Sequence, residues 1–91
     1  MIIVRHLCGY DKTTELIAVE YLILDSLLPT VRTLIRPKRG DRDLALAYDI
    51  APENTRRLAT MLGVAVDADA YDFTVESGYV PQSAQARASA A

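Results

Sequence analysis

The first 24 residues decide the fold, and they read MIIVRHLC (1–8), GYDKTT (9–14) and ELIAVEYLIL (15–24). The first and third segments are rich in β-branched and other apolar residues, which favour strands. The polar segment between them begins with a glycine, so it predicts a hairpin loop with Gly9 at a bulge. Both faces of the third segment are mostly apolar, which predicts a central strand covered by helices on one side. The N-terminal quarter of the chain is therefore a predicted strand-loop-strand unit.

Two helices are predicted further along the chain. Apolar residues at helical spacing predict a short amphipathic helix over residues 27–36, with Ser26 as its N-cap and Pro37 just after its end. A second helix is expected to begin at Pro52, because proline fits the first turn of a helix. Gly63 is a natural residue to end it, since glycine readily adopts the left-handed conformation.

Two more strands complete the predicted fold. Residues 44–50 are ambiguous between strand and helix, but their short length favours a strand. Residues 71–76 alternate between apolar and polar side chains, which predicts a strand with one face in water. Its inward residues are Tyr71, Phe73 and Val75, and its outward residues are Asp72, Thr74 and Glu76. The predicted order is β-β-α-β-α-β, an α+β domain with a mixed or antiparallel sheet and two helices on one face.

The composition indicates one ordinary globular domain, which we expect to span residues 1–80. The chain has 91 residues, 51% of them hydrophobic, and a net charge of −2, so neither a membrane nor a nucleic acid is indicated by overall charge. Cys8 is the only cysteine, and the N-terminus lacks a secretory pattern, so we expect a soluble cytoplasmic protein. Residues 81–91 are small and polar, rich in Ala and Ser, and predict a disordered tail.

His6 and Cys8 are the pair in the sequence that most suggests chemistry. They lie two apart on a predicted strand and so share a face, where they could supply two metal ligands or a nucleophile and its base. A tetrahedral site needs more ligands, and the chain has no second His or Cys. No calcium-loop pattern and no Gly-rich phosphate loop occurs. We therefore predict no catalytic residues, no metal and no cofactor, and we expect that the protein is not an enzyme.

Two oppositely charged segments are the candidate binding sites. Residues 64–80 contain acids and no cation, with tyrosines interleaved, which is typical of a protein-binding patch. The predicted partner-binding residues are Asp67, Asp69, Tyr71, Asp72 and Glu76. Residues 32–42 are basic and could bind phosphate or nucleic acid, although the segment has no aromatic residue for base stacking. The candidate anion-binding residues are Arg36, Lys38, Arg39 and Arg42.

Short turn and strand signatures are spread over most of residues 1–77. They are GYDKTTEL at 9–16, VEY at 19–21, YDI at 48–50, Leu58 with Leu62-Gly63, and YDFTVE at 71–76. Together they resemble small uncharacterised bacterial α+β domains that are encoded beside polymorphic or contact-dependent toxins and are thought to be immunity proteins. The resemblance implies a cytoplasmic protein that neutralises a toxin domain by occluding its active site or substrate path. It implies no catalytic residues.

The leading hypothesis is therefore a non-catalytic protein-binding inhibitor, an immunity protein whose partner is a cognate toxin domain. If that toxin is a nuclease, its cleft should be basic, and the acids of residues 67–76 are expected to bind it. If the toxin's site is acidic instead, the cations of residues 36–42 become the binding residues. Two alternatives stay open: a nucleic-acid or phosphate-binding module that uses the basic segment, and a structural homo-oligomer, such as a homodimer, built through the strand at 16–24.

Overall fold

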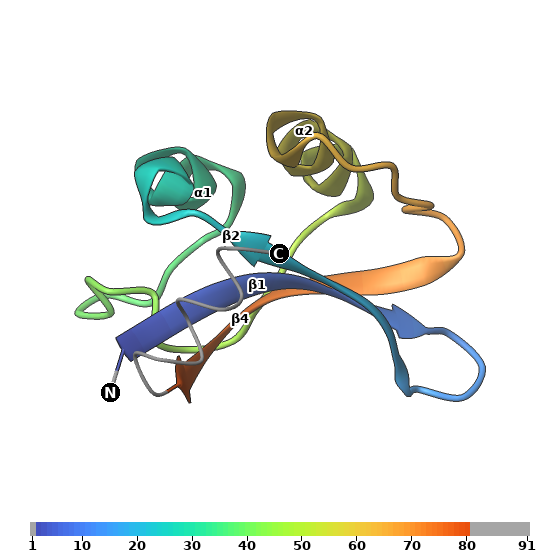
Figure 1. Ribbon diagram of the computed structural model, residues 1–91, viewed down its shortest axis with the longest axis horizontal. Coiled ribbons are helices and arrows are strands. Elements are labelled where there is room, and N and C mark those ends of the chain that lie inside the picture. Colours follow the sequence, from blue (N-terminus) through green and yellow to red (C-terminus); the bar gives the residue numbers. More distant parts are fainter. Residues whose placement is uncertain (1, 81–91) are drawn as a thin grey trace.

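One antiparallel sheet and two helices make up the fold (Figure 1). The computed structural model describes residues 2–80, and the predicted tail at 81–91 lies outside the described residues. The elements in order are β1 (Ile2–Asp11), β2 (Ile17–Ile23), the 3₁₀ helix η1 (Asp25–Leu27), α1 (Leu28–Leu34), β3 (Tyr48–Asp49), α2 (Pro52–Leu62) and β4 (Tyr71–Val80). Both α-helices pack on the same face of the sheet (Figure 1). The predicted α+β fold and its element order are confirmed.

The strand order is β2-β1-β4-β3, so β1 is central and pairs along its whole length with β4. The prediction of a central second strand was wrong, because β2 lies at the edge of the sheet. β2 pairs with β1 through the hairpin, and the other edge of β1 pairs with β4, so β2 has only one neighbouring strand. The apolar residues Leu16 and Ile17 are consequently 69% and 49% exposed instead of buried between layers.

The hairpin between β1 and β2 is confirmed, and its pairing register shifts between Gly9 and Tyr10, as predicted for a bulge. Gly9 is paired with Val19 on one side and with Phe73 on the other. A Cβ atom on Gly9 would lie 2.6 Å from Cγ2 of Val19 and 2.9 Å from the ring of Phe73. Glycine is therefore required here for the close packing of side chains from the two neighbouring strands.

The helix α2 begins and ends as predicted. Pro52 stands in its first turn, and Gly63 closes it with a φ of 70°. The helix α1 is shorter than the predicted 27–36, and Ser26 is not its N-cap. The reason is that Ser26 is wound into η1, which moves the N-cap position of α1 to Leu27, a residue without a side-chain acceptor.

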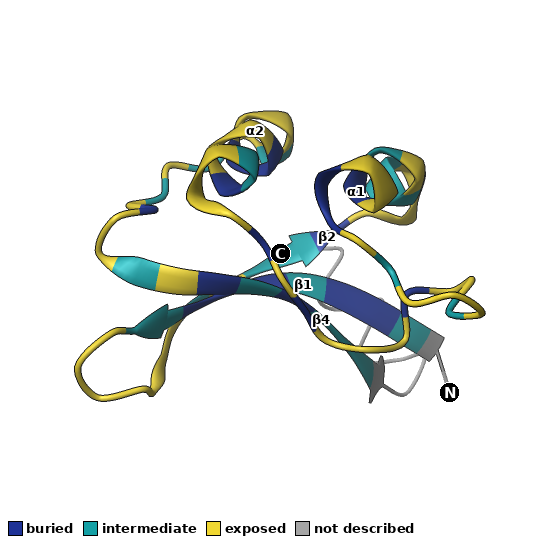
Figure 2. Ribbon diagram, turned by 180° about the vertical axis from the view of Figure 1, so that it is seen from behind, coloured by how far each residue is buried: buried dark blue, intermediate teal, exposed yellow. Residues whose placement is uncertain are grey.

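The core lies between the helices and one face of the sheet. Leu7, Ile23 and Val75 come from three strands, and Val31 and Leu58 come from the two helices, and all are at most 1% exposed. Figure 2 shows buried segments on the strands and on the sides of the helices that face the sheet, while the outer sides of the helices are exposed. No helix within residues 2–80 has the length and apolar character needed to cross a membrane.

The predicted strand at 44–50 is a strand only at Tyr48–Asp49. Leu44 has a φ of 51° and is 2% exposed, so its side chain reaches the core from a turn. The carboxylate of Asp41 accepts hydrogen bonds from the amides of Ala45 and Leu46. These amides are thus bonded to a side chain and not to a neighbouring strand, and β3 is limited to Tyr48–Asp49.

Candidate functional site

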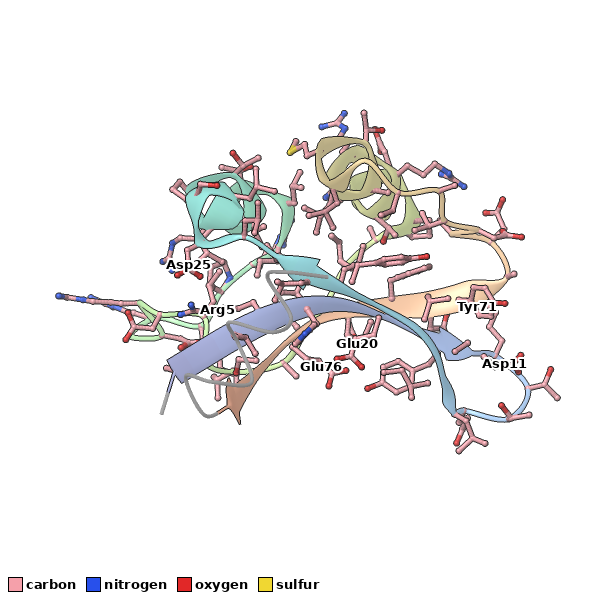
Figure 3. All side chains as sticks on the ribbon, viewed as in Figure 1. Arg5, Asp11, Glu20, Asp25, Tyr71 and Glu76 are labelled. Carbon is pink, nitrogen blue, oxygen red and sulfur yellow. The ribbon has the colours of Figure 1, made fainter. Side chains whose placement is uncertain are left out.

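The sheet face opposite the two helices is the candidate site, and we call it the open face. Figure 3 shows Glu20 and Glu76 extending from this face, away from the helices. The residues that the pairing register assigns to it include Val4, His6, Cys8 and Tyr10 of β1, Glu20 and Leu22 of β2, Asp49 of β3, and Asp72, Thr74 and Glu76 of β4. It carries four carboxylates and one imidazole, with no Lys or Arg among its described residues. The open face is therefore acidic.

Glu76 is held in place by its neighbours on the open face. Its Oε2 atom accepts a hydrogen bond from the Tyr10 hydroxyl at 2.5 Å and another from the Thr74 hydroxyl at 2.6 Å. The hydrogen bond to Glu76, followed by burial, raises the pKa of Tyr10 to about 12. Tyr10 thus stays protonated at neutral pH and remains a donor, which fixes the direction of the Glu76 carboxylate.

His6 and Cys8 share the open face, as predicted. Burial raises the pKa of Cys8 to about 12, with further contributions from the carboxylates of Glu76 and Glu20. The free thiol is therefore neutral at pH 7. Nε2 of His6 lies 3.5 Å from Oε1 of Glu20. Within residues 2–80 no three His, Cys, Asp or Glu side chains are grouped so that they could hold a metal ion.

The five predicted partner-binding residues do not share one surface. Asp72 and Glu76 lie on the open face. Tyr71 lies on the helix-covered face, where its ring packs edge-on against Phe73 with the two ring centroids 6.3 Å apart. Because successive residues of a strand point to opposite faces, Tyr71 and Asp72 cannot contact the same flat partner surface.

Asp67 and Asp69 lie in the turn before β4. Oδ1 of Asp67 accepts hydrogen bonds from the amides of Asp69 and Ala70, at 3.1 and 3.0 Å, and so shapes the turn. Asp69 forms an ion pair with Arg56 of α2, with 2.9 Å between Oδ1 and NH2. Both acids therefore have local partners in the structure and belong to the turn before β4, not to the open face.

Two acids of the open face were not among the predicted site residues. Glu20 is the one charged residue of β2, and Asp49 belongs to the two-residue strand β3. A single charged residue in an otherwise apolar strand indicates a side chain that faces solvent, so the sequence could have marked Glu20 as a site residue. Its neighbours on the face could not be read from the sequence, since they come from strands β1 and β4 through the pairing register.

A pocket of about 350 Å³ lies between the start of β4 and the start of α2. Its lining includes Tyr71, Phe73 and Thr55 together with the charged residues Lys12, Asp49 and Asp72. Two carboxylates and one ammonium group give the pocket a negative charge, and both carboxylates belong to residues of the open face. Its volume and charge suit one basic side chain of a partner.

The predicted basic segment contains an ordered loop over residues 36–46, which we call the basic loop. Asp41 organises it by accepting hydrogen bonds from the Ala45 amide at 2.8 Å, the Leu46 amide at 3.2 Å and the Tyr48 hydroxyl. The Tyr48 hydroxyl in turn accepts a bond from the Lys38 amide at 3.0 Å. The hydrogen bond from Tyr48, followed by that from the Ala45 amide, lowers the pKa of Asp41.

We expect Asp41→Asn to lower the melting temperature at neutral pH, because one acceptor oxygen is replaced by a donor facing other donors. The folded pKa of Asp41 is lowered, so its contribution is complete above the unfolded pKa of about 3.9 and is lost as pH falls through the folded value. The difference in melting temperature between the two proteins should shrink as the pH is lowered from about 7 to about 3. Circular dichroism measures it, and a constant difference would contradict the role of the ionised carboxylate.

The fold and the open face define a small α+β domain with one sheet face uncovered by helices. Residues 4–76 match the family model described as a domain of unknown function (DUF7683), and the chain belongs to this family. The match includes both helices and nearly all of the sheet. The predicted membership of an uncharacterised domain family is thereby confirmed. No curated protein matches the chain, and no solved structure does.

Proposed function

We propose that this chain is a non-catalytic protein-binding domain whose open face binds a partner with a basic surface. The observation that carries the proposal is the charge of that face, on which Glu20, Asp49, Asp72 and Glu76 occur without a Lys or Arg among the described residues. Complementary charge accelerates association and selects the partner.

One carboxylate of the open face, that of Glu76, is preorganised for binding. The hydrogen bonds of Tyr10 and Thr74 hold Glu76 in one orientation, so less side-chain freedom is lost when a partner binds. Glu20 and Asp72 are exposed and can reach a partner directly.

In its most concrete form, the proposal is that the protein is an immunity protein for a bacterial toxin domain. The resemblance of the turn and strand signatures supports this form. The acidic open face supports it as well, since a toxin that cleaves nucleic acid needs a basic cleft for its substrate. Binding of the open face over that cleft would exclude the substrate and neutralise the toxin.

Charge reversal on the open face tests the proposal. We expect Asp72→Lys and Glu20→Lys each to weaken binding to the cognate toxin domain by about tenfold or more. Isothermal titration calorimetry measures the affinity. Asp69→Lys is the matched control, because Asp69 is also exposed but belongs to the turn before β4 and pairs with Arg56.

Unchanged affinity in both open-face variants would overturn the proposal. A loss confined to Asp69→Lys would instead assign the contact to the turn before β4. Co-expression provides a second readout: cells that produce the toxin domain should grow when the wild-type chain is present and should stop growing with the Asp72→Lys variant. A gene neighbourhood with metabolic enzymes and no secreted toxin would count against the immunity form.

A further inference from the structure

Four cations of the basic loop are exposed and lie outside every ion pair formed within residues 2–80; they are Arg36, Lys38, Arg39 and Arg42. The other arginines of that range are engaged. Arg56 forms an ion pair with Asp69, and Arg57 forms one with Glu53. Arg5 is buried. Four of the exposed cations that form no ion pair within residues 2–80 are thus gathered in one loop, while Lys12 and Arg32 lie outside it.

The acid within this group is turned inward. Both oxygens of the Asp41 carboxylate are bonded to the amides of Ala45 and Leu46 and to the Tyr48 hydroxyl. Asp41 therefore does not pair with the neighbouring cations. The carboxylate of Asp43 is exposed at the end of the loop, and the outward charge of the loop is still positive, with four cations against one acid.

The backbone that carries these cations is fixed to the body of the domain. Arg32 of α1 donates from NH1 to the carbonyl of Arg42 at 2.9 Å, and Arg5 of β1 donates from Nε to the carbonyl of Asp43 at 3.1 Å. Leu44 is buried in the core. A loop held in this way presents its charges without a large ordering cost on binding.

The basic loop lies at the opposite end of the sheet from the pocket. In Figure 1 it extends from the domain at the left, beside the start of β1, whereas the hairpin between β1 and β2 lies at the right. Figure 3 shows Arg5 near the loop and Tyr71, which lines the pocket, at the opposite end of the sheet. A ligand on the loop would leave the pocket free.

We propose that the basic loop binds the phosphate backbone of a double-stranded nucleic acid. Several exposed Lys and Arg side chains on a protruding segment match a row of phosphates. A single strand fits less well, because its binding uses aromatic side chains as stacking platforms. The aromatic residue at the loop is Tyr48, which is 9% exposed with its hydroxyl bonded to Asp41. Contact is therefore made to the backbone, without reading of the base sequence.

Fluorescence anisotropy with a labelled DNA duplex of about 20 base pairs and mixed sequence tests the proposal. We expect binding at about 20 mM salt, with log K falling against log salt at a slope of about −3 to −4, since each neutralised phosphate contributes about −0.9. The variant with all four cations changed to Gln should bind at least about tenfold more weakly, and its slope should approach zero.

Arg57→Gln is the matched control, because Arg57 is an exposed arginine on α2 that pairs with Glu53. It should bind the duplex like the wild type. An unchanged circular dichroism spectrum and melting temperature of the loop variant would show that the loss is not caused by unfolding.

The absence of an anisotropy change at low salt would overturn the proposal, as would equal binding by the loop variant. Equal affinity for a single strand of the same length would overturn the assignment to a duplex. Sedimentation with phosphatidylserine vesicles in place of DNA tests the other source of phosphate, and binding to vesicles without binding to the duplex would also overturn it. The experiment needs no protein partner, so its outcome is independent of the proposed function.

Discussion

Replacing Gly9 with alanine is expected to destabilise the domain by about 1–3 kcal/mol, the usual range for an added methyl group in a well-packed core. The new Cβ atom would lie 2.6 Å from Cγ2 of Val19 and 2.9 Å from the Phe73 ring. Neither neighbour moves away easily. The side chain of Val19 is branched at Cβ and therefore stiff, and Phe73 is only 5% exposed.

The matched control is Gly78→Ala. Gly78 also lies in a strand, and a Cβ atom there would have no neighbour within 4 Å. Alanine restricts the unfolded chain more than glycine does, so this variant should be neutral or more stable by up to about 1 kcal/mol. Urea unfolding followed by circular dichroism measures both. Equal midpoints for the two variants would contradict the packing argument.

Replacing Arg5 with methionine is expected to cost about 2–3 kcal/mol of unfolding free energy. The Arg5 side chain is 9% exposed, and its Nε and NH2 atoms both donate to the carbonyl of Asp43. This contact fastens the basic loop to the central strand β1. Methionine keeps most of the apolar stem but leaves the carbonyl of Asp43 without the two donors that this partly buried contact supplies.

Two further variants separate the carbonyl contact from the ion pair. NH1 of Arg5 lies 3.4 Å from Oδ1 of Asp25, whose side chain is 71% exposed, so Asp25→Asn should cost less than about 0.5 kcal/mol. Arg5→Lys keeps the charge and loses the planar fork, so it should restore less than half of the stability lost in Arg5→Met. Chemical denaturation compares the three. A cost for Asp25→Asn equal to that of Arg5→Met would assign the stabilisation to the ion pair.

The two proposals assign opposite charges of one small domain to different partners. The acidic open face is proposed to bind a basic protein surface, and the basic loop is proposed to bind phosphates. The carboxylates of the open face would repel a nucleic acid. This repulsion would confine the contact of the nucleic acid to the basic loop and would orient the nucleic acid on the domain.

Local features of the fold could be predicted because their causes lie within a few residues. Pro52 and Gly63 act on the first and last turns of α2 and therefore mark its ends. The alternation in residues 71–76 reflects the strand itself, and it correctly assigns Phe73 and Val75 to the core.

The predictions from the sequence were wrong where a contact between distant residues overrides the local pattern. An apolar run such as β2 has the same composition at the centre or at the edge of a sheet, and the pairing of β1 with β4 decided between them. Residues 44–50 resemble a strand, but the hydrogen bonds of Asp41 and the burial of Leu44 hold most of them in a turn.

The candidate site shows the same division. Neighbouring acids in the sequence suggested one patch, yet Asp69 pairs with Arg56 while Asp72 lies on the open face. Glu20 reaches that face from the other end of the chain, because β1 pairs with both β2 and β4.

The predicted strand-loop-strand unit of residues 1–24 forms, as do both helices and the C-terminal strand. The sequence by itself determined these element types and their order, because periodicity, proline and glycine act locally. Only the tertiary structure decided the strand order, the uncovered face and the carboxylates that share it. These depend on pairing between residues as far apart as Cys8 and Thr74, which no local pattern encodes.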